Sequence, residues 1–193
     1  MDIRVTNLNK AYGEKTVLKD TNMVFPAGQR TVIMGDSGCG KTTLLRIVLG
    51  LETCDSGEIT GVPARVSAVF QEDRLLEDFC AVSNIIFASD KSITKDTILS
   101  HLEEVGLHES AYQSVSKLSG GMKRRVAIAR AMLAKKELLI LDEPLKGLDE
   151  QNRERITDYI KRHSEGVTTI IVTHYIDEID LMDAALIRME TVE

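Results

Sequence analysis

Short apolar segments alternate along this chain with stretches that have the apolar spacing of helices. The segments RTVIM (30–34), ARVSAVF (64–70), ELLILD (137–142) and VTTIIVT (167–173) are largely apolar, which predicts buried strands. The segment AALIRM (184–189) is predicted to be an edge strand. Strands that are apolar on both faces and are separated by helices indicate a parallel sheet covered by helices on both sides.

The helical segments have recognisable starts and stops. Residues 41–50 are predicted to form a helix that ends at Gly50, and Asp149 is a suitable N-cap for a helix that turns Ile156 and Ile160 inward. Residues 74–134 are predicted to be a largely helical lobe inserted into the sheet, with one helix ending at Gly106. Two apolar stripes with helical spacing lie in it: Ile98, Leu102 and Val105, and Met122, Val126, Ala129 and Leu133.

The first residues of the chain have a different pattern. IRVTNL (3–8) and NMVF (22–25) are predicted to be short strands on either side of the turn YGEKT (12–16). These strands predict an antiparallel β subdomain at the edge of the main sheet. No repeat or long linker divides the sequence, so residues 1–193 are expected to form one domain.

Composition narrows the class of protein. Hydrophobic residues make up 43% of the 193 residues and the formal net charge is −6, so the bulk charge does not favour a nucleic-acid partner. The three cysteines, Cys39, Cys54 and Cys80, have no metal-binding spacing and fit a reducing compartment. No apolar run approaches the ~20 residues that span a bilayer. We therefore expect a cytoplasmic protein that reaches a membrane only through a partner.

The segment GDSGCGKTT (35–43) predicts a phosphate-binding loop. It matches the pattern G-x-x-x-x-G-K-[ST] and lies between a predicted strand and a predicted helix, where backbone N–H groups can surround phosphate oxygens. Lys41 is expected to reach the β- and γ-phosphates, and the Thr42 hydroxyl to bind Mg²⁺. The predicted nucleotide contacts are Gly35, Asp36, Ser37, Gly38, Cys39, Gly40, Lys41, Thr42 and Thr43.

Two carboxylates follow a second buried strand in LLILDEP (138–144). Asp142 stands at the carboxyl end of that strand, where open α/β sheets bind ligands, and is predicted to hold hydrated Mg²⁺. Pro144 favours extended geometry at Glu143, which would keep this second carboxylate at the strand tip. One carboxylate for the metal and one for water suits hydrolysis.

A second glycine-containing loop, LSGGM (118–122), precedes a basic helix. Ser119, Gly120 and Gly121 could bind a phosphate at the helix N-terminus. The alternative is a serine-capped helix with a solvated basic face. That face would carry Lys123, Arg124, Arg125 and Arg130, with no acidic residue between positions 118 and 136.

Together these motifs resemble the ATP-binding subunit of ABC transporters, and the resemblance covers nearly the whole chain. It implies that LSGGM is the family's signature loop, that Tyr12 stacks on adenine, and that His174 in IVTH is the switch histidine. It also implies that Gln71 touches the metal and faces the membrane subunit. Its implied catalytic residues are Lys41, Gln71, Glu143 and His174. Two departures stand out: Met122 replaces the usual glutamine, and the loop KGLD (146–149) has an unusual Lys146 and Gly147.

The resemblance implies an α/β P-loop NTPase fold and ATP hydrolysis with Mg²⁺, coupled to transport. Two identical ATPase subunits would face each other head to tail, so that Ser119, Gly120 and Gly121 of one close on the ATP held by the other. Membrane-spanning permease subunits and a substrate-binding protein would be further partners, with the chain on the cytoplasmic face of the membrane. The segment VFQEDRLL (69–76) is similar to importers of the nitrate, sulfonate and taurine type.

Other functions were weighed from the same residues. A small-molecule kinase would have no use for LSGGM, and a nucleotide sensor that does not hydrolyse ATP would not need Glu143 and His174. A soluble ABC-type ATPase usually has a long coiled coil or two ATPase units in one chain, and this sequence has neither feature. We also expect residues 75–87 to dock the membrane subunit, and Cys39 to react faster than Cys54 or Cys80 unless ATP protects it.

Overall fold

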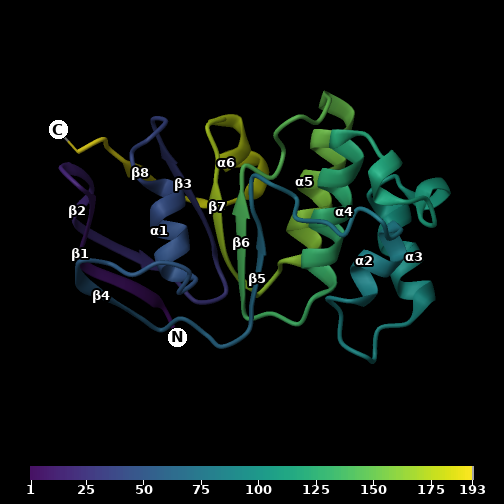
Figure 1. The fold of residues 1–193 in the computed structure, drawn as a ribbon, viewed down its shortest axis with the longest axis horizontal. Helices are drawn as coiled ribbons and strands as arrows, with labels where there is room; N and C mark the ends of the chain where they lie inside the picture. The colour runs from purple at the N-terminus through teal and green to yellow at the C-terminus, as the bar shows by residue number, and fades with distance from the viewer. Residues whose placement is uncertain (193) are drawn as a thin grey trace.

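The computed structural model describes residues 1–192 and has an α/β fold, as the sequence predicted (Figure 1). The strands are β1 (Ile3–Tyr12), β2 (Lys15–Phe25), β3 (Arg30–Gly35), β4 (Ser56–Thr60), β5 (Val66–Val69), β6 (Leu138–Asp142), β7 (Thr168–Val172) and β8 (Ala185–Met189). The helices are α1 (Lys41–Val48), α2 (Ala81–Ile86), α3 (Lys95–Glu104), α4 (Gly120–Leu133), α5 (Glu150–His163) and α6 (Asp177–Met182). Two 3₁₀ turns, η1 (His108–Ser110) and η2 (Val115–Lys117), precede α4.

Five strands form a parallel sheet in the order β5-β6-β7-β3-β8. Its central strands are apolar on both faces because each face is covered. One face carries Ile33, Leu138 and Ile170, which pack with α1, β1 and β2. The other face carries Val32, Leu139 and Ile171, which pack with α4, α5 and the rest of the helical segment. Successive residues of a strand therefore enter different cores, as the two-residue period of a strand requires.

The antiparallel sheet has the order β2-β1-β4 and lies at one end of the molecule, while α2 and α3 lie at the other (Figure 1). Its first two strands are longer than predicted. Tyr12 pairs with Lys15, so the predicted five-residue turn is only a two-residue reversal at Gly13 and Glu14. Gly13 has a φ of 61°, which suits such a tight hairpin turn.

Two elements were missed by the sequence analysis. The strand β4 is largely exposed, with only Ile59 partly buried on its inner side, so it has no apolar pattern that would reveal it. The short helix α6 lies between β7 and β8. The predicted caps are present: Asp149 accepts a hydrogen bond from the backbone of Asn152, and Gly106 follows α3 with a φ of 70°. None of the helices described in residues 1–192 is long and apolar enough to cross a membrane.

Candidate functional site

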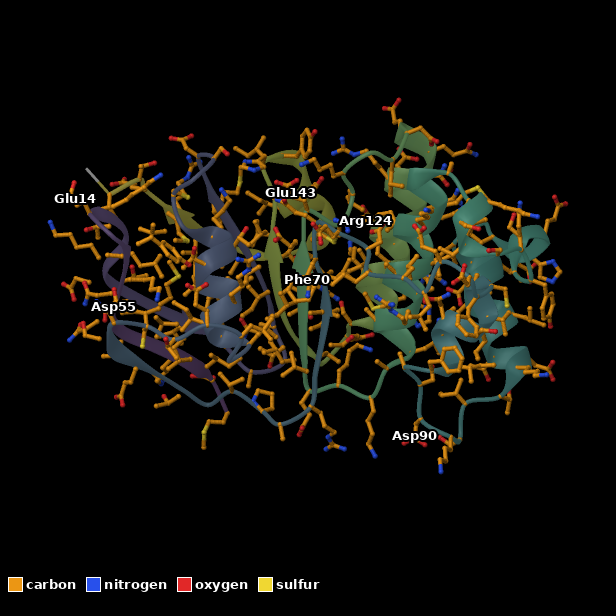
Figure 2. All side chains as sticks on the ribbon, in the orientation of Figure 1. Glu14, Asp55, Phe70, Asp90, Arg124 and Glu143 are labelled. Atoms are coloured by element: carbon orange, nitrogen blue, oxygen red, sulfur yellow. The ribbon has the colours of Figure 1, made fainter. Side chains whose placement is uncertain are left out.

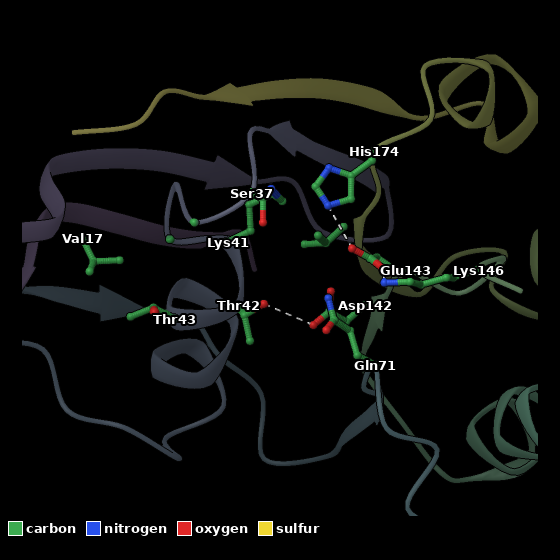
Figure 3. Close-up of a pocket in the computed structure, with 13 residues that line it drawn as sticks. Val17, Ser37, Lys41, Thr42, Thr43, Gln71, Asp142, Glu143, Lys146 and His174 are labelled. Atoms are coloured by element: carbon green, nitrogen blue, oxygen red, sulfur yellow. Dashed lines mark hydrogen bonds and ion pairs between the residues drawn. The ribbon is translucent and has the colours of Figure 1, made fainter. Parts of the chain in front are cut away.

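A cavity of about 450 Å³ opens where β6 and β7 end and α1 begins (Figure 3). This is the carboxyl edge of the parallel sheet, where open α/β folds bind ligands. Its lining combines the phosphate-loop segment with the residues that follow β5, β6 and β7. The lining residues are Val17, Ser37, Gly38, Gly40, Lys41, Thr42, Thr43, Gln71, Asp142, Glu143, Lys146, Val172 and His174.

The phosphate loop depends on glycine at Gly40. This residue has a φ of 98° and immediately precedes α1, and a Cβ atom there would lie 2.8 Å from the carbonyl oxygen of Val17. Any other residue would strain the backbone and collide with β2. The conformation leaves the N-terminus of α1 open toward the cavity, where its free N–H groups and dipole favour anions.

Lys41 lies across the loop that precedes it. Its Nζ atom donates to the carbonyl oxygens of Gly35 at 2.6 Å and Asp36 at 2.8 Å, and the residue is only 6% exposed. Gly35 and Asp36 therefore contribute to the site through their carbonyl groups. They also line a neighbouring cavity, together with His174. A nearly buried ammonium group beside a helix N-terminus gives this part of the cavity a strong preference for phosphate.

Asp142 is suited to hold a metal ion. The Thr42 hydroxyl lies 3.5 Å from its Oδ2 atom, while its Oδ1 atom is buried and has no hydrogen-bond partner among the described residues. Burial, together with the neighbouring charge of Glu143, raises the pKa of Asp142. A divalent cation would satisfy the orphaned oxygen and stabilise the ionised carboxylate. The oxygens of Asp142, Thr42 and Gln71, which face the same cavity, are the ligand types that Mg²⁺ prefers.

Both carboxylate oxygens of Glu143 have partners. Oε1 lies 2.9 Å from His174 Nε2, and Oε2 lies 2.6 Å from Lys146 Nζ. Burial opposes ionisation of Glu143. The hydrogen bonds and charges of Lys146 and His174 outweigh burial and lower the pKa of this carboxyl group. Glu143 is therefore an ionised carboxylate in the cavity. It is held by His174, which follows β7, and by Lys146 in the loop after β6.

The sequence did not indicate three lining residues, Val17, Lys146 and Val172, as parts of the site. Val17 belongs to β2 and lies against Gly40, a contact between a strand and the phosphate loop that no local motif reveals. Lys146 was noted only as a departure in the KGLD loop. The sequence did contain one sign of the Lys146–Glu143 ion pair. The two residues are three positions apart, a spacing that lets side chains meet across a turn.

Several predicted nucleotide contacts lie outside this lining. Tyr12 is 48% exposed, its hydroxyl group bonds to Glu52, and the Lys10 ammonium lies 5.2 Å from its ring centre. Adenine stacking by Tyr12 therefore stays a prediction. Cys39 is 1% exposed and packs in the core between α1 and the sheets, where its Sγ atom lies 3.7 Å from Lys41 Nζ. This burial removes the basis for expecting a reactive Cys39 thiol.

The signature-like residues Ser119, Gly120 and Gly121 also lie outside the cavity lining. Ser119 is the N-cap of α4 and accepts a hydrogen bond from the backbone N–H of Met122 at 3.3 Å. Ser119 and Gly120 are exposed. The serine cap of that alternative is therefore present, and the loop presents an accessible helix N-terminus on another part of the surface.

The predicted solvated basic face of α4 is wrong. Arg124 is 4% exposed, and the other basic side chains bind specific acceptors. Lys123 pairs with Glu77, Arg125 donates to the carbonyl oxygens of Val105 and Gly106, and Arg130 donates to those of Asp73 and Arg74. These arginines reach backbone groups at the ends of neighbouring segments. A run of charges cannot reveal this, because carbonyl acceptors leave no mark in the sequence.

The chain belongs to the ABC transporter family, whose sequence model matches residues 18–146. ATP-binding subunits of this family are ATPases, and the phosphate loop, Asp142 and Glu143 all fall within the matched segment.

Individual relatives agree with this assignment. The aliphatic sulfonates import ATP-binding protein SsuB 2 of Pseudomonas syringae pv. tomato is 40% identical over 180 residues, which cover 92% of this chain and 77% of the relative. The spermidine/putrescine import ATP-binding protein PotA of Pasteurella multocida is 38% identical over 89% of this chain and 51% of its own length. The dimeric structure of MJ0796, a bacterial ABC transporter cassette, superposes with a TM-score of 0.85 at 28% identity, covering 97% of this chain and 94% of that one.

Proposed function

We propose that this chain is the ATP-hydrolysing, energy-coupling subunit of a membrane importer. Residues 1–193 would act as one ATPase domain, with the lobe of residues 74–134 turned toward the membrane partner. The observation that carries the proposal is the cavity that joins the Lys41 loop, Asp142, Glu143 and His174 at one edge of the sheet. The names of the relatives, which are import ATP-binding proteins, support the direction of transport.

Each part of the cavity has a defined role in this proposal. Lys41 and the N–H groups at the start of α1 bind the β- and γ-phosphates. Thr42, Gln71 and Asp142 hold Mg²⁺, which would neutralise phosphate charge. Glu143 accepts a proton from the water whose oxygen attacks the γ-phosphorus, and the bond from that phosphorus to the β–γ bridging oxygen breaks. His174 holds Glu143 in place through its 2.9 Å contact.

The second loop acts on a second molecule. Ser119, Gly120 and Gly121 lie outside the cavity of their own chain, yet they offer an exposed helix N-terminus that can bind phosphate. We propose that two copies pair head to tail, each closing its signature loop on the ATP of the other. The dimeric state of the related cassette supports this arrangement. ATP then stabilises the closed pair, and hydrolysis releases it.

The solute is chosen elsewhere. The sulfonate and the spermidine/putrescine relatives carry chemically opposite solutes, one anionic and one cationic, although their ATP-binding chains are 40% and 38% identical to this one. Permease subunits, and a substrate-binding protein where the importer has one, would supply solute specificity. The ATPase chain would dock to the permease at the cytoplasmic face and couple ATP hydrolysis to transport.

The decisive experiment compares Glu143→Gln with the same variant carrying Ser119→Arg. Glutamine keeps the shape of Glu143 but is a poor base, so hydrolysis should fall by roughly 10²–10⁴-fold while ATP still binds. At high protein concentration with excess ATP, Glu143→Gln should form a dimer in size-exclusion chromatography with light scattering. Adding Ser119→Arg should leave a monomer that still binds ATP.

Two outcomes would contradict the proposal. If Ser119→Arg abolishes ATP binding by the monomer, the second loop acts within its own chain. If Glu143→Gln hydrolyses ATP at the wild-type rate, Glu143 is not the base. Co-purification with permease subunits, and stimulation of ATP hydrolysis by them, separates a transporter subunit from a soluble ATPase of the same family.

A further inference from the structure

The guanidinium group of Arg124 connects three separate segments of the chain. One nitrogen, Nη2, donates to the carbonyl oxygens of Asp142 at 2.7 Å and Glu143 at 2.6 Å. The other, Nη1, donates to Asp73 Oδ1 at 2.9 Å and to the carbonyl oxygen of Phe70. Arg124 itself belongs to α4, which begins at the signature loop. Figure 2 labels Arg124 with two of the residues whose carbonyl groups it binds, Phe70 and Glu143.

This placement is costly for a charged group. The Arg124 side chain is 5% exposed, and its ion-pair partner, Asp73, is 22% exposed. Removing a guanidinium from water is unfavourable unless its donors are paired, and the remaining acceptors here are neutral carbonyl groups. An apolar residue could fill the same space without that cost. The four directed contacts indicate that Arg124 holds backbone groups in position, in addition to its packing.

The backbone at Glu143 needs such support. Its φ is 50°, so the extended geometry expected before Pro144 is wrong, and the residue has a left-handed conformation that is unfavourable for a residue with a side chain. Its N–H donates to the carbonyl oxygen of Val172 at 2.8 Å, and its own carbonyl oxygen accepts from Arg124. Both sides of the strained residue are therefore held. The direction of the Glu143 side chain follows from that backbone conformation.

The neighbouring arginines Arg125 and Arg130 do not bind the backbone of Asp142 or Glu143. Arg130, on the same helix, donates to the carbonyl oxygens of Arg74 at 2.9 Å and Asp73 at 3.0 Å, so it binds the segment after β5 but no residue at the end of β6. Arg125 binds the end of α3. Among these three arginines, Arg124 alone touches the residues that carry the proposed metal ligand and base.

We propose that Arg124 is a positioning residue for ATP hydrolysis, which fixes the peptide groups of Asp142 and Glu143. It makes their placement depend on the Phe70–Asp73 segment, which contains Gln71, and on the helix of the signature loop. Displacement of any of the three segments then shifts the carboxylate that receives the proton from water. This inference rests on the proposed role of Glu143 as the base.

The test replaces the planar guanidinium group of Arg124 while keeping its positive charge. In Arg124→Lys, an ammonium group cannot reach all four acceptors, so kcat should fall by about 10–100-fold, the cost of a misplaced catalytic group. The KM for ATP should stay within about threefold of wild type, because the Lys41 loop is untouched. The matched control, Arg125→Lys, is on the same helix but loses contacts to the carbonyl oxygens of Val105 and Gly106 instead, so it should keep kcat within about threefold. Thermal unfolding and binding of a non-hydrolysable ATP analogue report on the integrity of each variant.

A double-mutant comparison separates this inference from the proposed function. Because Arg124 acts through Glu143, adding Arg124→Lys to Glu143→Gln should change the residual hydrolysis by less than about threefold. If the two losses multiply, Arg124 does not act through Glu143. If Glu143→Gln alone retains full activity, the proposed base is wrong, whatever Arg124→Lys does.

A second variant decides the question if Arg124→Lys folds poorly. Asp73→Asn leaves the guanidinium in place but removes the charge of its ion-pair partner, so it should lower kcat by several-fold with little change in KM. An unchanged kcat in this variant, or a folded Arg124→Lys whose kcat equals that of Arg125→Lys, overturns the inference.

Discussion

Lys146 and Glu143 form an ion pair in which Nζ and Oε2 are 2.6 Å apart. With His174 on Oε1, this contact leaves neither oxygen of the proposed base without a partner. In Lys146→Met, one oxygen becomes available to accept a proton from water. Since Lys146 is 61% exposed and its charge is screened, we expect a rise in the basal ATPase rate of at most about fivefold. Lys146→Arg, which keeps the charge, is the control, and a rate that falls in Lys146→Met would show that the lysine assists the base.

Lys41→Ala should remove tight ATP binding. Lys41 is 6% exposed and its ammonium group donates to the loop carbonyls of Gly35 and Asp36, so the substitution removes a positive charge held inside the phosphate loop. Isothermal titration calorimetry should show a dissociation constant raised by more than about tenfold. Lys91→Ala, at an exposed position in the helical lobe, should match wild type. An affinity for Lys41→Ala within about threefold of wild type contradicts the expected role.

A histidine far from the cavity should make the protein sensitive to acid. His101 in α3 bonds through Nδ1 to the hydroxyl group of Tyr159 at 2.7 Å. Burial lowers the pKa of His101, and the charges of His163 and Lys136 lower it further against the opposing effect of Glu104. The unfolded chain therefore binds this proton at a higher pH, about 6.5, than the folded chain does. Its contribution to stability is complete above about pH 6.5 and is lost as the pH falls toward the lower folded value.

Urea denaturation at about pH 7.5 and about pH 5.5 checks this sign. The free energy of unfolding should fall less between these two pH values in His101→Gln than in the wild type. His108→Gln, at an exposed position outside the cluster, should keep the wild-type pH dependence. An unchanged pH dependence in His101→Gln would show that another group controls the acid sensitivity.

The segment of residues 75–87 should contact the permease if the proposed transport function is correct. Leu76, Phe79, Ile86 and Phe87 are 49%, 46%, 42% and 61% exposed, and the rings of Phe79 and Phe87 pack edge to face at 5.2 Å. Exposed apolar side chains gathered in a short segment are typical of an interaction surface. Leu75, in contrast, packs against the core and is not expected to take part.

Cysteine cross-linking in the assembled transporter is the measurement. Phe87→Cys, with the native cysteines replaced, should cross-link to the permease. Glu14→Cys at the opposite end of the molecule (Figure 2) should not. Cross-links from position 14 alone would place the docking face on the antiparallel sheet instead.

The parts of the fold that could be predicted from the sequence are those whose pattern lies within a few consecutive residues. The phosphate loop, the apolar run before Asp142 and the cap at Asp149 are each complete within a few positions, and the structure contains all three as elements. The strand β4 could not be predicted, because a mostly exposed strand has no apolar period.

Contacts between distant segments were also beyond sequence reasoning. Arg124 was expected on a solvated face, although its acceptors include the Asp73 carboxylate and the Asp142 carbonyl oxygen, 51 and 18 residues away. The Cys39 thiol was expected to be reactive because of its place beside a helix N-terminus, but its side chain turns into the core. In both cases the local pattern was correct and the direction of the side chain depended on tertiary packing.

The pairing of β5 with β6 has a consequence for how this chain can vary. All of the helical segment between them, which includes α2, α3 and α4, is a single connection that leaves one strand and returns to its immediate parallel neighbour. The pairing of the two strands fixes only the two ends of such a crossover. The length and conformation of the crossover can therefore change without altering the order of the strands in the sheet. Exchange of this connection between paralogues is therefore a natural route by which one ATP-hydrolysing core could acquire new membrane partners. The Arg124 contacts mark the point at which an exchanged segment would have to be refitted to the core.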